Sequence, residues 1–154
     1  SAYWIGRRAP ETVACAADGR GSATQLTAAI LDRLQVDEPR SALGALEKTG
    51  NVRGAIALLA DVVEATARGG DASASAIVDE AAEELASMVA TLAKQLSFEE
   101  EFPLALAGGV ICGSELLRDR LHAALASRSL KPSPVKLVPN PVAGCLRIAQ
   151  QQLA

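Results

Sequence analysis

Aromatic residues are scarce in this chain: one tryptophan, one tyrosine and two phenylalanines make up 3% of 154 residues. Hydrophobic residues nevertheless reach 49%, and alanine and leucine fill many of the apolar positions. Strands favour aromatic and β-branched side chains, whereas alanine and leucine favour helices. The composition therefore disfavours a β-sandwich and predicts tightly packed helices.

Histidine and cysteine are also scarce. The single histidine is His122, and the three cysteines, Cys15, Cys112 and Cys145, form no C-x-x-C pair. Zinc sites need several such ligands at short spacing, and disulfide frameworks use an even number of cysteines. We therefore expect neither kind of site and a reduced, cytoplasmic protein. His122 has no obvious acidic or nucleophilic partner, which favours a structural or surface position.

Charge and long apolar runs are limited as well. The net charge is −3 and charged residues are 21% of the chain. A weakly acidic chain has no general attraction for nucleic acid or anionic membranes. No apolar run approaches the roughly 18 residues needed to span a bilayer. We expect no nucleic acid or membrane partner. The low proportion of charged residues suggests that something absent from this chain covers part of its surface, and a homo-oligomer is a separate candidate.

Most of the chain carries apolar residues at helical spacing. The clearest stripe, after a glycine turn and a capping Asp71, steps by three or four through Ile77, Ala81, Leu85, Met88, Leu92 and Leu96. Pro10 is awkward for a first helix. Other expected helices are one through Tyr3 and Val13, one after Ser22 or Thr24, and those over 39–48, 56–66 and after the Asn140–Pro141 pair. A further helix is expected over 114–127, with Ser114 as its cap.

Two short strands are expected near the C-terminus. One begins at Pro103, and the other covers Val135 to Val138. The intervening helix predicts a parallel pair, because such crossovers join parallel strands. The prediction is a helix-rich α/β fold in one partial domain over 1–154, mainly helical over 1–102 and βαβα over 103–154. A two-stranded sheet is weak alone, so further strands are expected from sequence outside this chain.

The sequence LALAGGV places Gly108 and Gly109 where the first strand gives way to a helix. Glycine there provides positive φ or lets a ligand approach the backbone closely. Ligands bind at the carboxyl ends of strands in open α/β sheets, but an ordinary turn explains the pair equally well. The motif is neither a P-loop nor G-x-G-x-x-G.

Other polar residues suggest structural roles. Glu99, Glu100 and Glu101 are expected in a solvated loop, and the acidic residues within 79–84 on an exposed helix face. Three arginines near the N-terminus, Arg7, Arg8 and Arg20, could meet a phosphate but more commonly pair with carboxylates. Tyr3 and Trp4 suit a core or interface better than a stacking platform. From these residues no nucleophile–base pair, carboxylate dyad or metal cage can be assembled.

Four stretches in the same order resemble a known family. SAYWIGRRA followed by DGRG, ARGGDASASAIVDEAAEEL, LALAGGV and NPVAGCLRIA are together similar to the C-terminal half of the N-acetylglucosamine kinase-like branch of the BadF/BadG ATPase family. The resemblance implies the C-terminal lobe of an actin-like, ribonuclease H-like ATPase fold. It also implies ATP, Mg²⁺ and an amino sugar as ligands of the whole protein.

The resemblance assigns roles by position. Gly108 and Gly109, flanked by Ala107 and Val110, would lie against the adenosine of ATP. Thr66 and Ala67 would form the other wall of that pocket, and Ser1 would follow the sugar-contacting acidic loop.

The family's first lobe, phosphate-binding hairpins and catalytic base have no counterpart in this chain. The resemblance therefore implies a fragment that is inactive alone, with the missing N-terminal lobe as its partner. A rival within the family is an ATPase activator of a dehydratase or reductase, which holds an iron–sulfur cluster through cysteines. A rival of another class is a non-catalytic helical interaction module.

Overall fold

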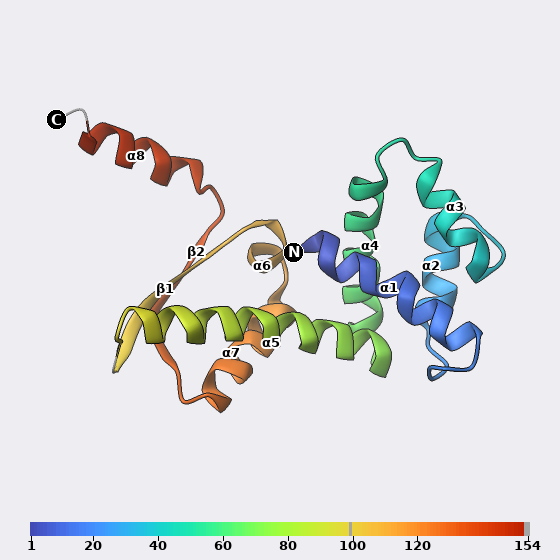
Figure 1. Cartoon of the computed structure of the whole chain (residues 1–154), viewed down its shortest axis with the longest axis horizontal. Helices are drawn as coiled ribbons and strands as arrows, with labels where there is room; N and C mark the ends of the chain where they lie inside the picture. The colour runs from blue at the N-terminus through green and yellow to red at the C-terminus, as the bar shows by residue number, and fades with distance from the viewer. Residues whose placement is uncertain (99, 153–154) are drawn as a thin grey trace. The chain divides into compact units, whose positions relative to one another are not determined.

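The computed structural model describes residues 1–98 and 100–152 (Figure 1). The chain divides after residue 85 into two compact units. The first consists of helices, and the second contains a short parallel sheet with helices. The expectation of one partial domain, mainly helical over 1–102 and βαβα over 103–154, stays a prediction.

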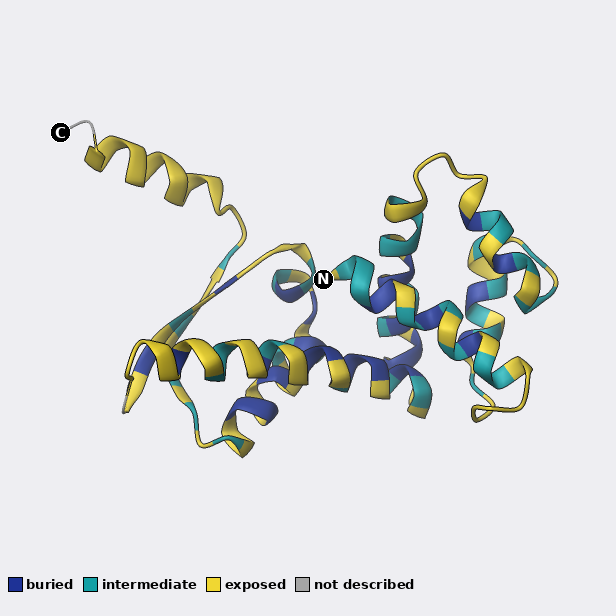
Figure 2. Cartoon of the chain, in the orientation of Figure 1, coloured by how far each residue is buried: buried dark blue, intermediate teal, exposed yellow. Residues whose placement is uncertain are grey.

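The first unit consists of helices that occur in the order expected from the sequence. Helix α1 crosses α4 closely at Gly6, where an added Cβ would overlap the carbonyl oxygen of Ile56. Buried residues such as Val13, Ile30 and Val63 form the core (Figure 2). The elements are α1 (Ala2–Ala17), α2 (Leu26–Leu34), the 3-10 turn η1 (Pro39–Ser41), α3 (Ala42–Glu47), α4 (Val52–Arg68) and the first part of α5 (Ala72–Gln95).

Helix starts in this unit are set by short polar side chains. Asn51 Oδ1 accepts from the Gly54 N–H at 3.0 Å, and Asp71 Oδ1 accepts from the Ala74 N–H at 2.8 Å. The expected Asp71 cap is therefore confirmed. Helix α2 begins later than the sequence suggested, after Gln25, although Thr24 Oγ1 still accepts from the Leu26 N–H. Pro10 lies inside α1, which continues through it to Ala17.

The second unit confirms the expected pair of parallel strands joined by a helix. Leu104 pairs with Val135 and Leu106 with Leu137. Both strands begin earlier than predicted, because proline is tolerated at the edge of a sheet. The elements are β1 (Glu101–Ala107), α6 (Gly109–Gly113), α7 (Glu115–Ser127), β2 (Lys131–Val138) and α8 (Val142–Gln152), which starts one residue after Pro141.

The apolar stripe of α5 is buried along only part of its length. Ile77 and Ala81 are buried, whereas Met88, Leu92 and Leu96 are 54%, 56% and 63% exposed. Three apolar residues of α8 are exposed to a similar degree: Val142, Leu146 and Ile148. The spacing identified the helix correctly but could not tell which turns would be covered. Among the described residues, no helix is both long and apolar enough to span a membrane.

Candidate functional site

Gly108 and Gly109 lie at the carboxyl end of β1, between its last residue, Ala107, and helix α6. Ala107 and both glycines are exposed, and Val110 is half-buried. The backbone is thus accessible where a ligand would meet an open α/β sheet.

The two glycines differ in what the chain itself requires of them. Gly108 has φ +117° and ψ 150°, a conformation that is essentially restricted to glycine. Gly109 has no positive φ, and a Cβ built on it would meet no heavy atom within 4 Å. Backbone geometry therefore explains Gly108 and leaves Gly109 unexplained. An alanine at 109 would fit this chain, so the fold itself does not require glycine there, as it does not at Gly44 or Gly113.

The loop is held in place by a short series of hydrogen bonds. The Cys112 N–H donates to the Gly108 carbonyl at 3.0 Å, and the Ser114 N–H donates to the Val110 carbonyl at 2.8 Å. Ser114 is buried, and its Oγ accepts from the Leu117 N–H at 3.0 Å, which confirms the expected cap of α7. The glycine pair is therefore presented by an ordered turn between β1 and α7.

Thr66 and Ala67, the other candidate wall, lie near the end of α4 in the first unit and are buried. Thr66 Oγ1 donates to the Val62 carbonyl at 2.8 Å, and the Thr66 carbonyl accepts from the Asp71 N–H at 3.3 Å. Their polar atoms thus support the α4–α5 turn, and their assignment to a nucleotide pocket stays a prediction.

Asp71 is a buried carboxylate that joins two helix starts. It accepts from Thr24 Oγ1, the Gln25 N–H and the Ala74 N–H, each at 2.8 Å. Burial alone would raise the pKa of Asp71, but the hydrogen bonds from Ala74, Gln25 and Thr24 outweigh it and the pKa is lowered. The sequence identified the Asp71 cap and named Thr24 as a candidate cap, but it did not predict the bond between them, because no local pattern connects residues 47 positions apart.

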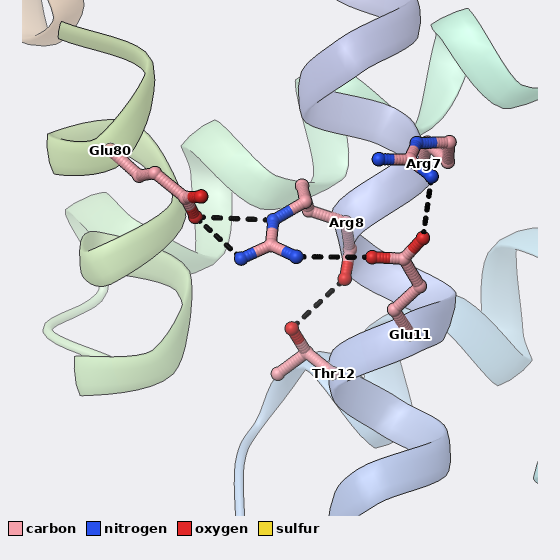
Figure 3. Close-up of polar contacts among 5 residues, drawn as sticks. All are labelled: Arg7, Arg8, Glu11, Thr12 and Glu80. Carbon is pink, nitrogen blue, oxygen red and sulfur yellow. Dashed lines mark hydrogen bonds and ion pairs between the residues drawn. The ribbon is translucent and has the colours of Figure 1, made fainter. Parts of the chain in front are cut away.

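The N-terminal arginines pair with carboxylates, as expected (Figure 3). Arg8 reaches Glu80 on α5 with an Nη2–Oε2 distance of 2.6 Å, and Glu11 accepts from both Arg7 and Arg8. Arg20 pairs with Asp18 at 2.7 Å. Ser1 Oγ accepts from the Trp4 N–H at 3.3 Å and caps α1, so its assignment to a sugar site stays a prediction.

The remaining polar candidates lie at the surface. His122, Glu100 and Glu101 are exposed, with Glu101 opening β1, and Glu99 lies outside the described residues. In the described part of the chain, no group of three or more His, Cys, Asp or Glu side chains could hold a metal ion. The Mg²⁺ implied by the resemblance therefore finds no protein ligand set in these residues.

A groove of about 790 Å³ in the first unit was not expected from the sequence. It lies between the end of α2 and helix α3, and its charged lining residues are Asp37, Glu38 and Lys48. Glu38 pairs with Arg40 at 2.6 Å. Nothing in its lining indicates a particular ligand.

Comparison with known proteins connects the chain to one family. The sequence model of the BadF/BadG/BcrA/BcrD ATPase family matches residues 1–144. Among solved structures, the chain is similar to a "putative N-acetylglucosamine kinase" from Chromobacterium violaceum, with 32% sequence identity and a TM-score of 0.62. That match covers 86% of this chain and 42% of the other. None of the curated proteins compared with the chain matches it significantly. The expected family and fold class are confirmed.

Proposed function

Because the chain belongs to the BadF/BadG/BcrA/BcrD ATPase family, we propose that it is the C-terminal part of an ATP-dependent amino-sugar kinase. In this proposal it supplies the adenosine side of the nucleotide site. N-acetylglucosamine is the proposed substrate class, since the similar solved protein carries that name. The three cysteines are free thiols, which supports a reduced, cytoplasmic setting.

The observation that carries the proposal is the open space at Gly109. The chain needs glycine at 108 for its backbone conformation, whereas at 109 the space beside the backbone is open. A flat purine or ribose lying against the Gly108–Gly109 backbone would need that space. The site is also at the carboxyl end of a parallel strand, where nucleotides bind in α/β folds.

The remaining parts of the reaction would come from the rest of the protein. The chain spans 42% of the length of the similar solved protein, and its described residues contain no metal ligand set. Positioning and charge stabilisation dominate phosphoryl transfer, so Mg²⁺ would be held by the nucleotide phosphates and by residues outside this chain. We propose that this chain alone is inactive.

The exposed apolar residues of the second unit support a missing partner. Met88 and Leu92 of α5 and Leu96, which follows its end, are more than half exposed, as are Val142 and Leu146 of α8. Soluble monomers rarely leave such residues uncovered together. We propose that the N-terminal lobe and its additional strands cover them in the whole protein.

An ATPase activator from the same family is the second candidate function. Such activators hold an iron–sulfur cluster through cysteines, and the described residues contain no group of three or more Cys, His, Asp or Glu side chains that could hold a metal ion. The solved neighbour also favours the kinase. A non-catalytic helical interaction module predicts no nucleotide binding at all, so the same experiment distinguishes it.

The test uses the full-length protein with Gly109→Val and a matched control, Gly44→Val. Gly44 also lies in a short helix, has no positive φ and has no heavy atom within 4 Å of an added Cβ. We expect Gly109→Val to raise the ATP KM at least about tenfold, or about 1.4 kcal/mol of binding, with little change in the sugar KM. Gly44→Val should leave both KM values unchanged.

Two results would contradict the proposal. An unchanged ATP KM in Gly109→Val would contradict the proposed contact between adenosine and Gly109. ATP hydrolysis without phosphoryl transfer to N-acetylglucosamine or another amino sugar would favour the activator instead.

A further inference from the structure

Helix α6 carries the glycine pair but has little stability of its own. It is five residues long and has glycine at both ends, Gly109 and Gly113. Isolated helices shorter than about 12 residues are marginal in water. The position of the Gly108–Gly109 backbone must therefore depend on contacts outside α6.

Arg118 makes such a contact from the first turns of α7. Its Nη1 donates to the Ile111 carbonyl and to the Cys112 carbonyl, both at 2.9 Å. These carbonyls lie near the carboxyl end of α6, where helices leave acceptors unsatisfied and carry partial negative charge. The guanidinium is half-buried, and hydrogen bonds with a charged donor are stronger than neutral ones.

Cys112 connects this contact to the glycines. Its carbonyl accepts from Arg118, and its N–H donates to the Gly108 carbonyl at 3.0 Å. Its thiol also donates to the Leu106 carbonyl on β1 at an S–O distance of 3.6 Å. A guanidinium on α7 is thus linked through one residue to both the strand end and the glycine turn.

We propose that Arg118 is a positioning residue for the nucleotide site, acting through Cys112 on the Gly108–Gly109 backbone. The proposal rests on the proposed function, because the site it positions is the adenosine contact. It assigns Arg118 no contact with ATP. A nucleotide that binds through backbone packing is sensitive to small displacements of that backbone, and Arg118 limits them.

The experiment compares Arg118→Gln and Arg118→Lys with the control Arg128→Gln in the full-length protein. Arg128 Nη1 donates to the Ala124 carbonyl at 3.0 Å, so it also bonds a helix carbonyl, at the far end of α7. Two readouts are taken: steady-state KM values for ATP and for N-acetylglucosamine, and hydrogen exchange of the Cys112 and Ser114 amides without nucleotide. Lysine can reach one of the two carbonyls and tests partial rescue.

We expect Arg118→Gln to speed amide exchange at Cys112 and Ser114 and to raise the ATP KM about tenfold, equivalent to about 1.4 kcal/mol. The sugar KM should stay unchanged. In both exchange rate and ATP KM, Arg118→Lys should lie between the wild type and Arg118→Gln, and Arg128→Gln should match the wild type. Unchanged amide exchange in Arg118→Gln would overturn the proposal, because Arg118 would then not restrain the glycine turn. Faster exchange with an unchanged ATP KM would also overturn it and leave Arg118 purely structural.

Failure of the proposed function gives a different result. If Gly109→Val leaves the ATP KM unchanged, the adenosine contact is absent and Arg118 has no nucleotide site to position. The exchange rates at Cys112 and Ser114 still show, independently of ATP, whether Arg118 holds the turn.

Discussion

Replacing Asp71 by alanine should destabilise the first unit strongly. The substitution removes an acceptor for three hydrogen bonds of 2.8 Å, from Thr24 Oγ1 and from the N–H groups of Gln25 and Ala74. Loss of the α5 cap at the Ala74 N–H costs about 1 kcal/mol, and leaving the part-buried Thr24 hydroxyl and Gln25 N–H without their acceptor costs a further 1–3 kcal/mol or so. We expect the free energy of unfolding to fall by about 3 kcal/mol, a large part of the roughly 5–15 kcal/mol typical of a domain.

Urea denaturation of this chain measures the effect. With an m-value of about 2 kcal/mol/M, the midpoint should fall by about 1.5 M without a change in m. The control is Asp61→Ala on the exposed side of α4, which should change stability by less than about 0.5 kcal/mol. If Asp71→Ala lowered the free energy of unfolding by less than about 0.5 kcal/mol, the stabilising role assigned to the three hydrogen bonds that Asp71 accepts would be refuted.

The pH dependence gives an independent check on Asp71. Its pKa in the folded chain lies below the ordinary value of 3.8. A lowered folded pKa means that the stabilisation is fully present above the unfolded value and is lost as pH falls through the folded value. The stability difference between wild type and Asp71→Asn should therefore be constant near neutral pH and shrink below about pH 4. A difference that grew on acidification would contradict this assignment.

Two further predictions concern packing. Gly6→Ala should cost about 1–3 kcal/mol of stability, because its Cβ would overlap the Ile56 carbonyl oxygen at the α1–α4 crossing. The control is Gly44→Ala, whose Cβ meets no heavy atom within 4 Å. Equal stability of the two variants in urea would contradict the predicted overlap at Gly6. This chain alone should self-associate through the exposed Met88, Leu92 and Leu96. Sedimentation at increasing concentration tests this, with Leu92→Glu expected to reduce association; a single monomeric species at high concentration would count against it.

Features that depend on neighbouring residues could be predicted from the sequence. Asp71 and Ser114 cap their helices as expected, because an N-cap bonds an N–H only three residues away. The parallel pairing of the two strands followed from the helix between them. The starts of β1 and β2 were placed too late, since the prolines at 103, 132 and 134 suggested breaks that a sheet edge tolerates.

Features that depend on distant residues could not be predicted in this way. Thr24 donates to Asp71 across 47 positions, and no sequence pattern marks that pair. The stripe of α5 reads the same along its length, yet Ile77 is buried and Leu92 is exposed. Periodicity records which face of a helix is apolar, whereas burial depends on what the fold places against each turn.

The glycine pair shows why a motif must be separated into its residues. From the sequence, Gly108 and Gly109 are equivalent, and a turn explains both as well as a ligand does. In the structure, positive φ accounts for Gly108 alone, while Gly109 occupies an ordinary helical position beside open space. A glycine that the chain does not need lowers the stability of an already short helix. Gly44 and Gly113 share this open setting, so open space by itself does not mark a ligand site. What separates Gly109 from Gly44 is its place at the carboxyl end of β1, and the proposed adenosine contact therefore depends on both features together.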